Sequence, residues 1–129
     1  MDKIANMLIT IKNGGNAGRD FVETPYSAYK QSIAKCLFDH GLIKGYDKKK
    51  RKTGDVLEIE INYKENGKPT VSDVKRISKP SRRLYASVKE IYKVRQGFGK
   101  LVLSTPKGIM TGEDARREMV GGEILFEIW

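Results

Sequence analysis

Apolar residues near the start of the chain recur at helical spacing. Four of them follow the steps of three and four residues that place side chains on one face of a helix: Ile4, Met7, Leu8 and Ile11. Asp2 is a favourable N-cap residue, and Gly14 is predicted to end the helix because glycine is common just past helix C-termini. The pattern therefore predicts a first helix between Asp2 and Gly14.

A second helix is predicted further along the chain. It would begin after Ser27, whose hydroxyl can cap it, and end at Gly41. The positions predicted to face inward share the helical spacing: Ile33, Ala34, Leu37 and Phe38. Between the two helices, a short strand at Phe21 and Val22 is predicted to stop at Pro25, because proline cannot donate a hydrogen bond to a neighbouring strand.

The segments that follow have the patterns of strands. Residues 42–46 begin one strand, which runs into the basic run 48–52. After Gly54 a second strand carries its apolar residues at alternate positions, so that one face is predicted to be buried: Leu57, Ile59, Ile61 and Tyr63. The basic run is predicted to lie at the tip of the hairpin between these strands, either as a solvated loop or as a source of phosphate contacts.

Beyond the Asn66-Gly67 turn the chain is predicted to be mostly β. The predicted strands cover residues 71–77, 84–86, 100–104 and 123–129. A short helix would begin at Thr111, with Asp114 as its capping-box partner, and would close at Gly121 or Gly122. The patterns predict an α+β fold with two small lobes. Residues 1–69 would form an α-β-α-β-β lobe, and residues 70–129 a mostly antiparallel β lobe with one short helix.

Positive charge is concentrated in one segment. The 129 residues include 25 Lys and Arg against 16 Asp and Glu, a net charge of +9. Between Lys75 and Lys107 there are ten basic residues and one acid, Glu90, so this segment alone has the net charge of the whole chain. A local excess of this kind indicates a polyanionic partner. A membrane is not expected as that partner, because no apolar run approaches the roughly 20 residues of a membrane-spanning helix.

The sequence gives little support for a disulfide, a zinc site or catalysis. A single cysteine, Cys36, cannot form an internal disulfide, so a reducing, cytoplasmic setting is expected. Cys36 and His40 are four residues apart, but two ligands without any further Cys or His cannot complete a zinc site. Ser104 and Lys107 have the spacing of a Ser-x-x-Lys acyl enzyme, yet Pro106 predicts a loop where those enzymes have a helix. We therefore expect no enzyme activity, no cofactor and no small-molecule substrate.

RNA binding accounts for more of the pattern. The basic segment is interleaved with Tyr85, Tyr92 and Phe98, and a hydroxyl-rich loop follows it. Basic residues neutralise phosphates, and short Ser and Thr side chains suit the 2′-hydroxyls of the shallow RNA minor groove. No recognition-helix pattern favours DNA. The alternative is a protein-interaction scaffold that uses its acidic and apolar strand faces, with incidental RNA contact.

Several motifs resemble one family, the eighth protein of the small ribosomal subunit. Residues 103–111 read LSTPKGIMT and residues 119–123 read MVGGE, similar to the family's LSTSKGVMT and GVGGE. Residues 76–85, RISKPSRRLY, are similar to RVSKPGRRVY, and residues 2–8, DKIANML, to DPIADML. The resemblance covers nearly the whole chain. It implies a two-lobe α+β protein that binds the central domain of small-subunit rRNA and supports subunit assembly. The implied partners include neighbouring small-subunit ribosomal proteins and, in bacteria, the messenger RNA of the protein's own operon, which it represses.

The resemblance also implies where the RNA binds. The family's main contacts fall in the C-terminal lobe and carry over onto seven residues: Ser104, Thr105, Lys107, Gly108, Gly121, Gly122 and Glu123. The basic turn adds further predicted contacts: Lys79, Arg82 and Arg83. The first helix would form a second contact region through three polar residues: Lys3, Asn6 and Lys12.

Two departures from the family pattern affect these expectations. Pro106 replaces the usual serine of the loop and removes one N–H and one hydroxyl. Lys3 replaces the usual proline at the start of the first helix, where it can add a phosphate contact. Glu123 is an acid beside a predicted RNA surface. We expect it to accept hydrogen bonds from the loop or from Lys107 and hold the loop in shape, in preference to contacting a base.

Overall fold

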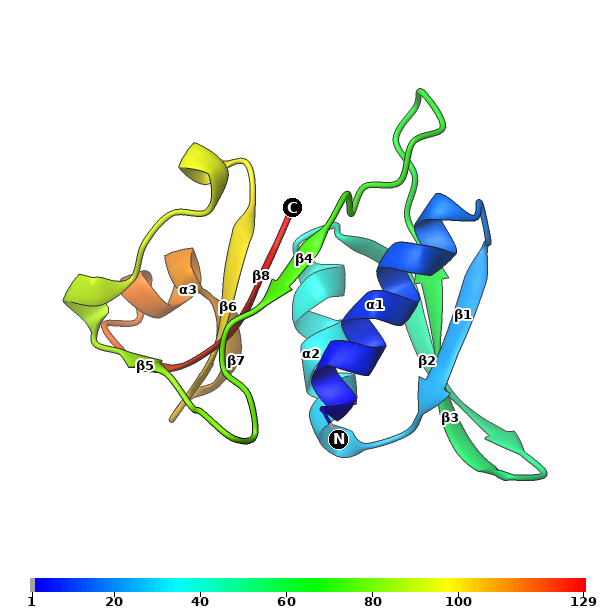
Figure 1. Cartoon of the computed structure of the whole chain (residues 1–129), viewed down its shortest axis with the longest axis horizontal. Coiled ribbons are helices and arrows are strands. Elements are labelled where there is room, and N and C mark those ends of the chain that lie inside the picture. The colour runs from blue at the N-terminus through cyan, green and yellow to red at the C-terminus, as the bar shows by residue number, and fades with distance from the viewer. Residues whose placement is uncertain (1) are drawn as a thin grey trace. The chain divides into compact units, whose positions relative to one another are not determined.

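The computed structural model describes residues 2–129, which form two compact units (Figure 1). The first unit is Lys3–Ser72, and the second is Asp73–Trp129 together with Asp2. Each combines helix with antiparallel sheet, which confirms the α+β prediction. Within residues 2–129, no helix has both the length and the apolar character needed to cross a membrane.

The first unit packs two helices against one face of a sheet. The helices are α1 (Lys3–Asn16) and α2 (Ala28–Asp39), and the strands are β1 (Phe21–Pro25), β2 (Ile43–Arg51) and β3 (Gly54–Ile61). The sheet is antiparallel in the order β1-β3-β2; α1 packs on β1 and β3, while α2 packs on β2 and β3. Its core comes from the predicted apolar positions: Met7, Leu8, Ile11, Ile33, Ala34, Leu37, Leu57, Ile59 and Ile61.

The first helix does not end at Gly14, as the sequence predicted. It continues through Gly14 and Gly15, both buried, to Asn16. A Cβ atom at Gly14 would lie 2.4 Å from Cγ1 of Val22, and one at Gly15 would lie 2.8 Å from Cβ of Pro69. These glycines are therefore required for close packing of the helix, and the left-handed backbone comes later, at Gly18 with a φ of 72°.

Two further predictions for this unit need correction. Phe38 is not inward, since 45% of it is exposed and its ring meets that of Tyr46 edge-on at 5.9 Å. The basic run is not a hairpin tip, because Lys48 to Arg51 belong to β2 and pair with β3. Only Lys52 and Thr53 form the turn between the two strands.

The second unit is organised around its last strand. Its strands are β4 (Val74–Arg76), β5 (Tyr85–Ala86), β6 (Lys100–Thr105), β7 (Gly108–Thr111) and β8 (Gly122–Ile128), and its helix is α3 (Gly112–Arg117). Two 3₁₀ turns lie at Val88–Glu90 and Arg95–Gly97. The antiparallel order is β4-β8-β6-β7, and β5 also pairs with β8. Strand β8 thus contacts every strand of this sheet except β7 (Figure 1).

The C-terminal motif differs in detail from the prediction. The segment after Leu103 is not an open loop but a tight hairpin, in which Thr105 pairs with Gly108 across Pro106 and Lys107. Thr111 caps α3 as predicted, with its side chain accepting a hydrogen bond from the Asp114 amide. The helix ends before the glycines, at Arg117, and the left-handed residue that follows is Met119, with a φ of 59°.

The packing at Gly14 can be tested by replacing it with alanine. Alanine is ordinarily about 1 kcal/mol better than glycine inside a helix. We expect the opposite sign for Gly14→Ala, because the new Cβ would overlap Val22. The free energy of unfolding, measured with urea, should fall by about 1–3 kcal/mol. Adding Val22→Ala removes the overlapping methyl group, so the double variant should lose less than the sum of the single losses. Strict additivity would contradict this explanation.

Candidate nucleic-acid interface

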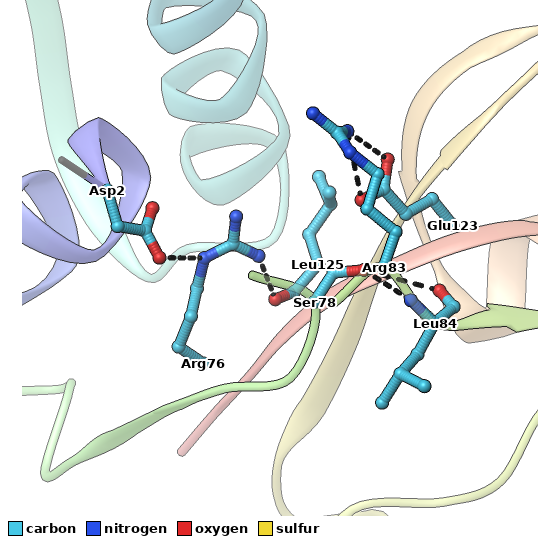
Figure 2. A network of polar contacts seen from close by, with 7 residues as sticks. All are labelled: Asp2, Arg76, Ser78, Arg83, Leu84, Glu123 and Leu125. Atoms are coloured by element: carbon cyan, nitrogen blue, oxygen red, sulfur yellow. Dashed lines mark hydrogen bonds and ion pairs between the residues drawn. The ribbon is translucent and has the colours of Figure 1, made fainter. Parts of the chain in front are cut away.

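The basic loop at residues 79–83 is closed by a buried serine. Ser78 is fully buried, and its Oγ accepts a hydrogen bond from the Leu84 amide at 2.8 Å and donates to the Leu84 carbonyl at 3.4 Å. Within the loop, Lys79 and Arg82 exchange backbone hydrogen bonds at 2.9 and 3.0 Å. The two hydrogen bonds between Ser78 and Leu84 fix both ends of the loop (Figure 2). The exposed basic side chains therefore extend from fixed backbone.

Arg83 forms an ion pair with Glu123. Its Nη1 lies 3.3 Å from both carboxylate oxygens, and Figure 2 shows the guanidinium above Glu123. Glu123 thus accepts hydrogen bonds as expected, but its partner is Arg83 and not Lys107 or the hairpin. This pair joins the basic loop to the start of β8.

The hairpin between β6 and β7 uses most of its own polar groups. The Thr105 hydroxyl donates to the Gly108 carbonyl at 2.8 Å and accepts from the Lys107 amide at 3.2 Å. Nζ of Lys107 lies 3.3 Å from a carboxylate oxygen of Glu118, with both side chains half exposed. The Ser104 hydroxyl, by contrast, has no hydrogen-bond partner within the described chain. It is the one hydroxyl of the hairpin that is available to a ligand.

A surface depression brings together several predicted site residues. It is lined by residues from β5, β6, β8 and the segments beside them: Tyr85, Ala86, Ser87, Glu90, Ser104, Pro106, Gly121, Gly122 and Glu123. Four of these were predicted contacts, namely Ser104, the two glycines and Glu123. Sequence reasoning left Tyr85 out of the site, although it is 68% exposed and directly follows the basic turn. The position of Tyr85 among basic residues in the sequence is the signal that could have placed it in the predicted site.

The two glycines of the depression are required by packing. A Cβ at Gly121 would lie 2.3 Å from the Ala86 carbonyl oxygen, and one at Gly122 would lie 2.1 Å from the Ser104 carbonyl oxygen. Because both obstacles are backbone atoms, no side-chain movement can make room. The glycines let β8 enter between β5 and β6, and they leave the depression without side chains at these two positions.

The basic residues of the segment 75–107 in the second unit fall into two groups. Four in the segment 75–107 pair with carboxylates: Arg76, Arg83, Lys100 and Lys107. The other six are exposed and make no ion pair within residues 2–129: Lys75, Lys79, Arg82, Lys89, Lys93 and Arg95. Arg76 is largely buried and is held between Asp2 and the Leu125 carbonyl (Figure 2). Within this segment, the charge available to a polyanion therefore comes from the six exposed residues without ion pairs.

The basic run of the first unit is largely neutralised by its own sheet. Three of its members pair with neighbouring acids: Lys48 with Asp55 at 3.6 Å, Lys49 with Asp47 at 3.3 Å, and Arg51 with Glu23 and Glu58. The run is the densest cluster of positive charge in the sequence, but its ion pairs reduce the charge it presents to a partner.

The predicted contacts on α1 lie on the first unit. Lys3 and Asn6 are exposed and Lys12 is half-buried, and the Asn6 carbonyl accepts a hydrogen bond from the Thr10 hydroxyl at 2.7 Å. Burial lowers the pKa of Lys30, and the positive charge of Lys3 lowers it further.

Two remaining sequence features have structural roles. Tyr92 donates from its hydroxyl to a carboxylate oxygen of Glu127 at 2.8 Å. That hydrogen bond holds the ring in place, and burial together with the hydrogen bond raises the pKa of Tyr92 to about 12. Cys36 is buried and His40 is the C-cap of α2. Within residues 2–129, no three His, Cys, Asp or Glu side chains are grouped to hold a metal ion.

Comparison with known proteins gives a consistent result. The family model described as ribosomal protein S8 matches residues 2–129. The chain is 43% identical over 128 residues to the small ribosomal subunit protein uS8 of Halothermothrix orenii, covering 99% of this chain and 97% of that protein. It is 43% identical over 129 residues to uS8 of Ruegeria pomeroyi, covering 99% and 98%. It is 39% identical over 135 residues to uS8 of Thermus aquaticus, with the same coverage.

The two hydrogen bonds between Ser78 and Leu84, which we call the Ser78 clamp, can be tested by removing the Ser78 hydroxyl. Ser78→Ala would leave the Leu84 amide without its acceptor, which ordinarily costs about 1–3 kcal/mol when the group is buried. We expect that loss in thermal or urea unfolding, together with faster hydrogen exchange at the Leu84 amide. Ser81→Ala is the matched control, since Ser81 is exposed in the same loop, and it should change stability by less than about 0.5 kcal/mol. Equal effects of the two variants would contradict the clamp.

Proposed function

The chain belongs to the ribosomal protein S8 family, and we propose that it binds small-subunit rRNA directly through its second unit. Membership makes it a structural constituent of the small ribosomal subunit, not an enzyme. The observation that carries the proposal is the depression of the second unit. It is lined by the Ser104 hydroxyl, which has no partner within the described residues, and by the uncharged backbone of Gly121 and Gly122. Exposed basic residues without ion pairs belong to the same unit.

The chemistry of the depression favours a base edge or a 2′-hydroxyl over a phosphate. Its lining contains no basic residue but includes the carboxylates of Glu90 and Glu123. Carboxylates repel phosphates and accept hydrogen bonds from amino and hydroxyl groups. Ser104 can donate or accept, and the exposed ring of Tyr85 offers a face for stacking. We therefore assign sequence-dependent contacts to the depression.

Phosphate contacts are assigned to the fixed basic loop. Lys79 and Arg82 are exposed, carry no ion pair, and extend from backbone that the Ser78 clamp fixes. Arg83 is already paired with Glu123, so a phosphate there would compete with the carboxylate. This arrangement follows the usual division in which phosphate contacts position a protein and base contacts specify the site.

Other parts of the predicted function are also proposals. The target is proposed to be the central domain of the rRNA, with binding that supports subunit assembly. The first helix, through Lys3, Asn6 and Lys12, is proposed as a second contact region. Neighbouring ribosomal proteins are proposed partners, as is the messenger RNA of the protein's own operon. With Pro106 in the hairpin, contacts that a serine would make there are expected to come from Ser104.

Specific contact is tested with Ser104→Ala. The RNA is a stem from the central domain of small-subunit rRNA, compared with an unrelated stem of equal length. Loss of one hydrogen bond of about 1 kcal/mol should weaken binding to the first stem roughly fivefold, with little change for the second. The control is Ser81→Ala, which should bind both stems as the wild type does. If the wild type binds the two stems equally, the proposal of specific rRNA binding is wrong.

Electrostatic contact is tested by salt dependence. Each phosphate neutralised contributes a slope of about 0.7–0.9 log units of affinity per log unit of salt. The double variant Lys79→Ala, Arg82→Ala should bind both stems more weakly, with a slope shallower by about 1.4–1.8. Lys49→Ala is the matched control, because Lys49 is paired with Asp47, and its slope should stay close to that of the wild type. Equal slope changes would mean that the two basic segments contribute alike.

A further inference from the structure

Phe98 is the most exposed large hydrophobic side chain of the second unit. It is 90% exposed, compared with 68% for Tyr85 and 42% for Tyr92, whose hydroxyl is bound to Glu127. It lies in the turn that joins the 3₁₀ segment Arg95–Gly97 to β6, outside the depression described above. Nothing in the packing of the second unit accounts for an aromatic ring at this position.

The turn that presents Phe98 is fixed in shape. The amides of Gly97 and Gly99 donate to the carbonyl of Val94, itself buried, at 2.9 and 3.1 Å. Gly99 has no room for a side chain, since a Cβ there would lie 2.6 Å from Cγ1 of Val94. A mobile surface loop would not need these constraints, so the exposure of Phe98 is built into the fold.

The backbone of this turn is also strained. Arg95, Gln96 and Gly97 have φ angles of 51°, 56° and 97°, and the first two are not glycine. Left-handed backbone at such residues is unfavourable, and residues of this kind cluster at functional sites. The turn that exposes Phe98 therefore contains an unfavourable backbone conformation.

The surroundings of the turn are cationic. No acidic residue occurs between Glu90 and Glu113, and Glu113 is paired with Lys100. Lys93 is exposed without an ion pair, and the guanidinium of Arg95 lies 4.3 Å from the centre of the Trp129 ring, which holds it in place without neutralising it. All charged residues between Ile91 and Gly112, on both sides of Phe98 in the sequence, are thus basic.

From these observations we infer that Phe98 is a stacking platform for an unpaired nucleotide, with Lys93 and Arg95 contacting the adjoining phosphates. Aromatic rings flanked by cations bind single-stranded RNA in this way, since every base has a face that can stack. A protein partner is disfavoured, because a hydrophobic anchor at a protein interface is ordinarily surrounded by apolar residues rather than exposed cations. The inference rests on the proposed RNA binding and extends it to a second, sequence-tolerant contact.

The test uses two RNAs from the central domain of small-subunit rRNA. One is the stem with its adjoining unpaired nucleotides, and the other is the same stem trimmed to paired nucleotides. Phe98→Leu keeps an apolar side chain but removes the aromatic face, and it should weaken binding to the longer RNA about tenfold without affecting the trimmed stem. Phe98→Trp should retain binding to both. Phe21→Leu, a half-exposed phenylalanine on the first unit, is the matched control and should change neither affinity.

Two further readouts separate stacking from other roles. The fluorescence of 2-aminopurine placed among the unpaired nucleotides should be quenched by the wild type and by Phe98→Trp, but much less by Phe98→Leu. Lys93→Ala should make the salt slope shallower by about 0.7, the value for a single-strand phosphate, whereas Phe98→Leu should leave the slope unchanged. Unaltered melting temperatures would show that the variants are folded.

The outcomes are distinguishable. If the wild type binds neither RNA, the proposed function itself fails. If it binds both and Phe98→Leu binds the longer RNA as tightly as the wild type, only the stacking inference is overturned. If Phe98→Leu weakens both RNAs equally, the ring does not contact the unpaired nucleotides, and the inference is likewise wrong. Loss of binding to another ribosomal protein, with RNA binding intact, would assign Phe98 to a protein interface.

Discussion

The second unit depends on a contact between backbones that only glycine permits. Strand β8 begins at Gly122, and a side chain at Gly121 or Gly122 would meet the carbonyl oxygens of Ala86 and Ser104. Because β8 pairs with β4, β5 and β6, this close approach sets the positions of three strands at once. The depression, the base of the hairpin and the end of the basic loop all follow from it. Removing the side chains at this point also leaves the surface open where Ser104 and Tyr85 are exposed.

The basic residues of the second unit have two different roles. Some basic residues are used within the fold, such as Arg76, which is held by Asp2 and the Leu125 carbonyl, and Arg83, which is held by Glu123. Others stay unpaired on fixed backbone, as Lys79 and Arg82 do. Cations of the first kind stabilise the site, and cations of the second kind attract a polyanion, so the sequence count of basic residues overstates the charge presented to a partner.

Local features of the fold could be predicted from the sequence. Both helices of the first unit and the alternating strand β3 follow from apolar spacing, and Ser27 and Thr111 are the caps that their positions indicate. The sequence-based prediction is wrong where one residue type can serve two structural roles. Glycine at a helix end and glycine at a close approach look alike in sequence, which is why Gly14 was misread. Which acid pairs with Arg83 depends on strands far apart in the chain, and no local pattern gives that information. The division into lobes of residues 1–69 and 70–129 stays a prediction.

The distribution of charge explains why the densest basic run is a poor guide to the binding surface. Residues 48–51 lie on a strand whose sheet supplies acids within ion-pair distance, so that Lys48 pairs with Asp55 and Arg51 pairs with Glu23 and Glu58. A basic strand placed beside an acidic one is partly neutralised as the sheet forms. In the second unit, five of the six basic residues of the segment 75–107 without ion pairs lie in turns, loops and 3₁₀ segments, and only Lys75 lies on a strand. Turns fixed by a buried hydroxyl at Ser78, or by backbone hydrogen bonds around Val94, keep such charges available and in place. Under the proposed function, RNA is therefore expected to contact these fixed turns rather than the segment with the most lysines.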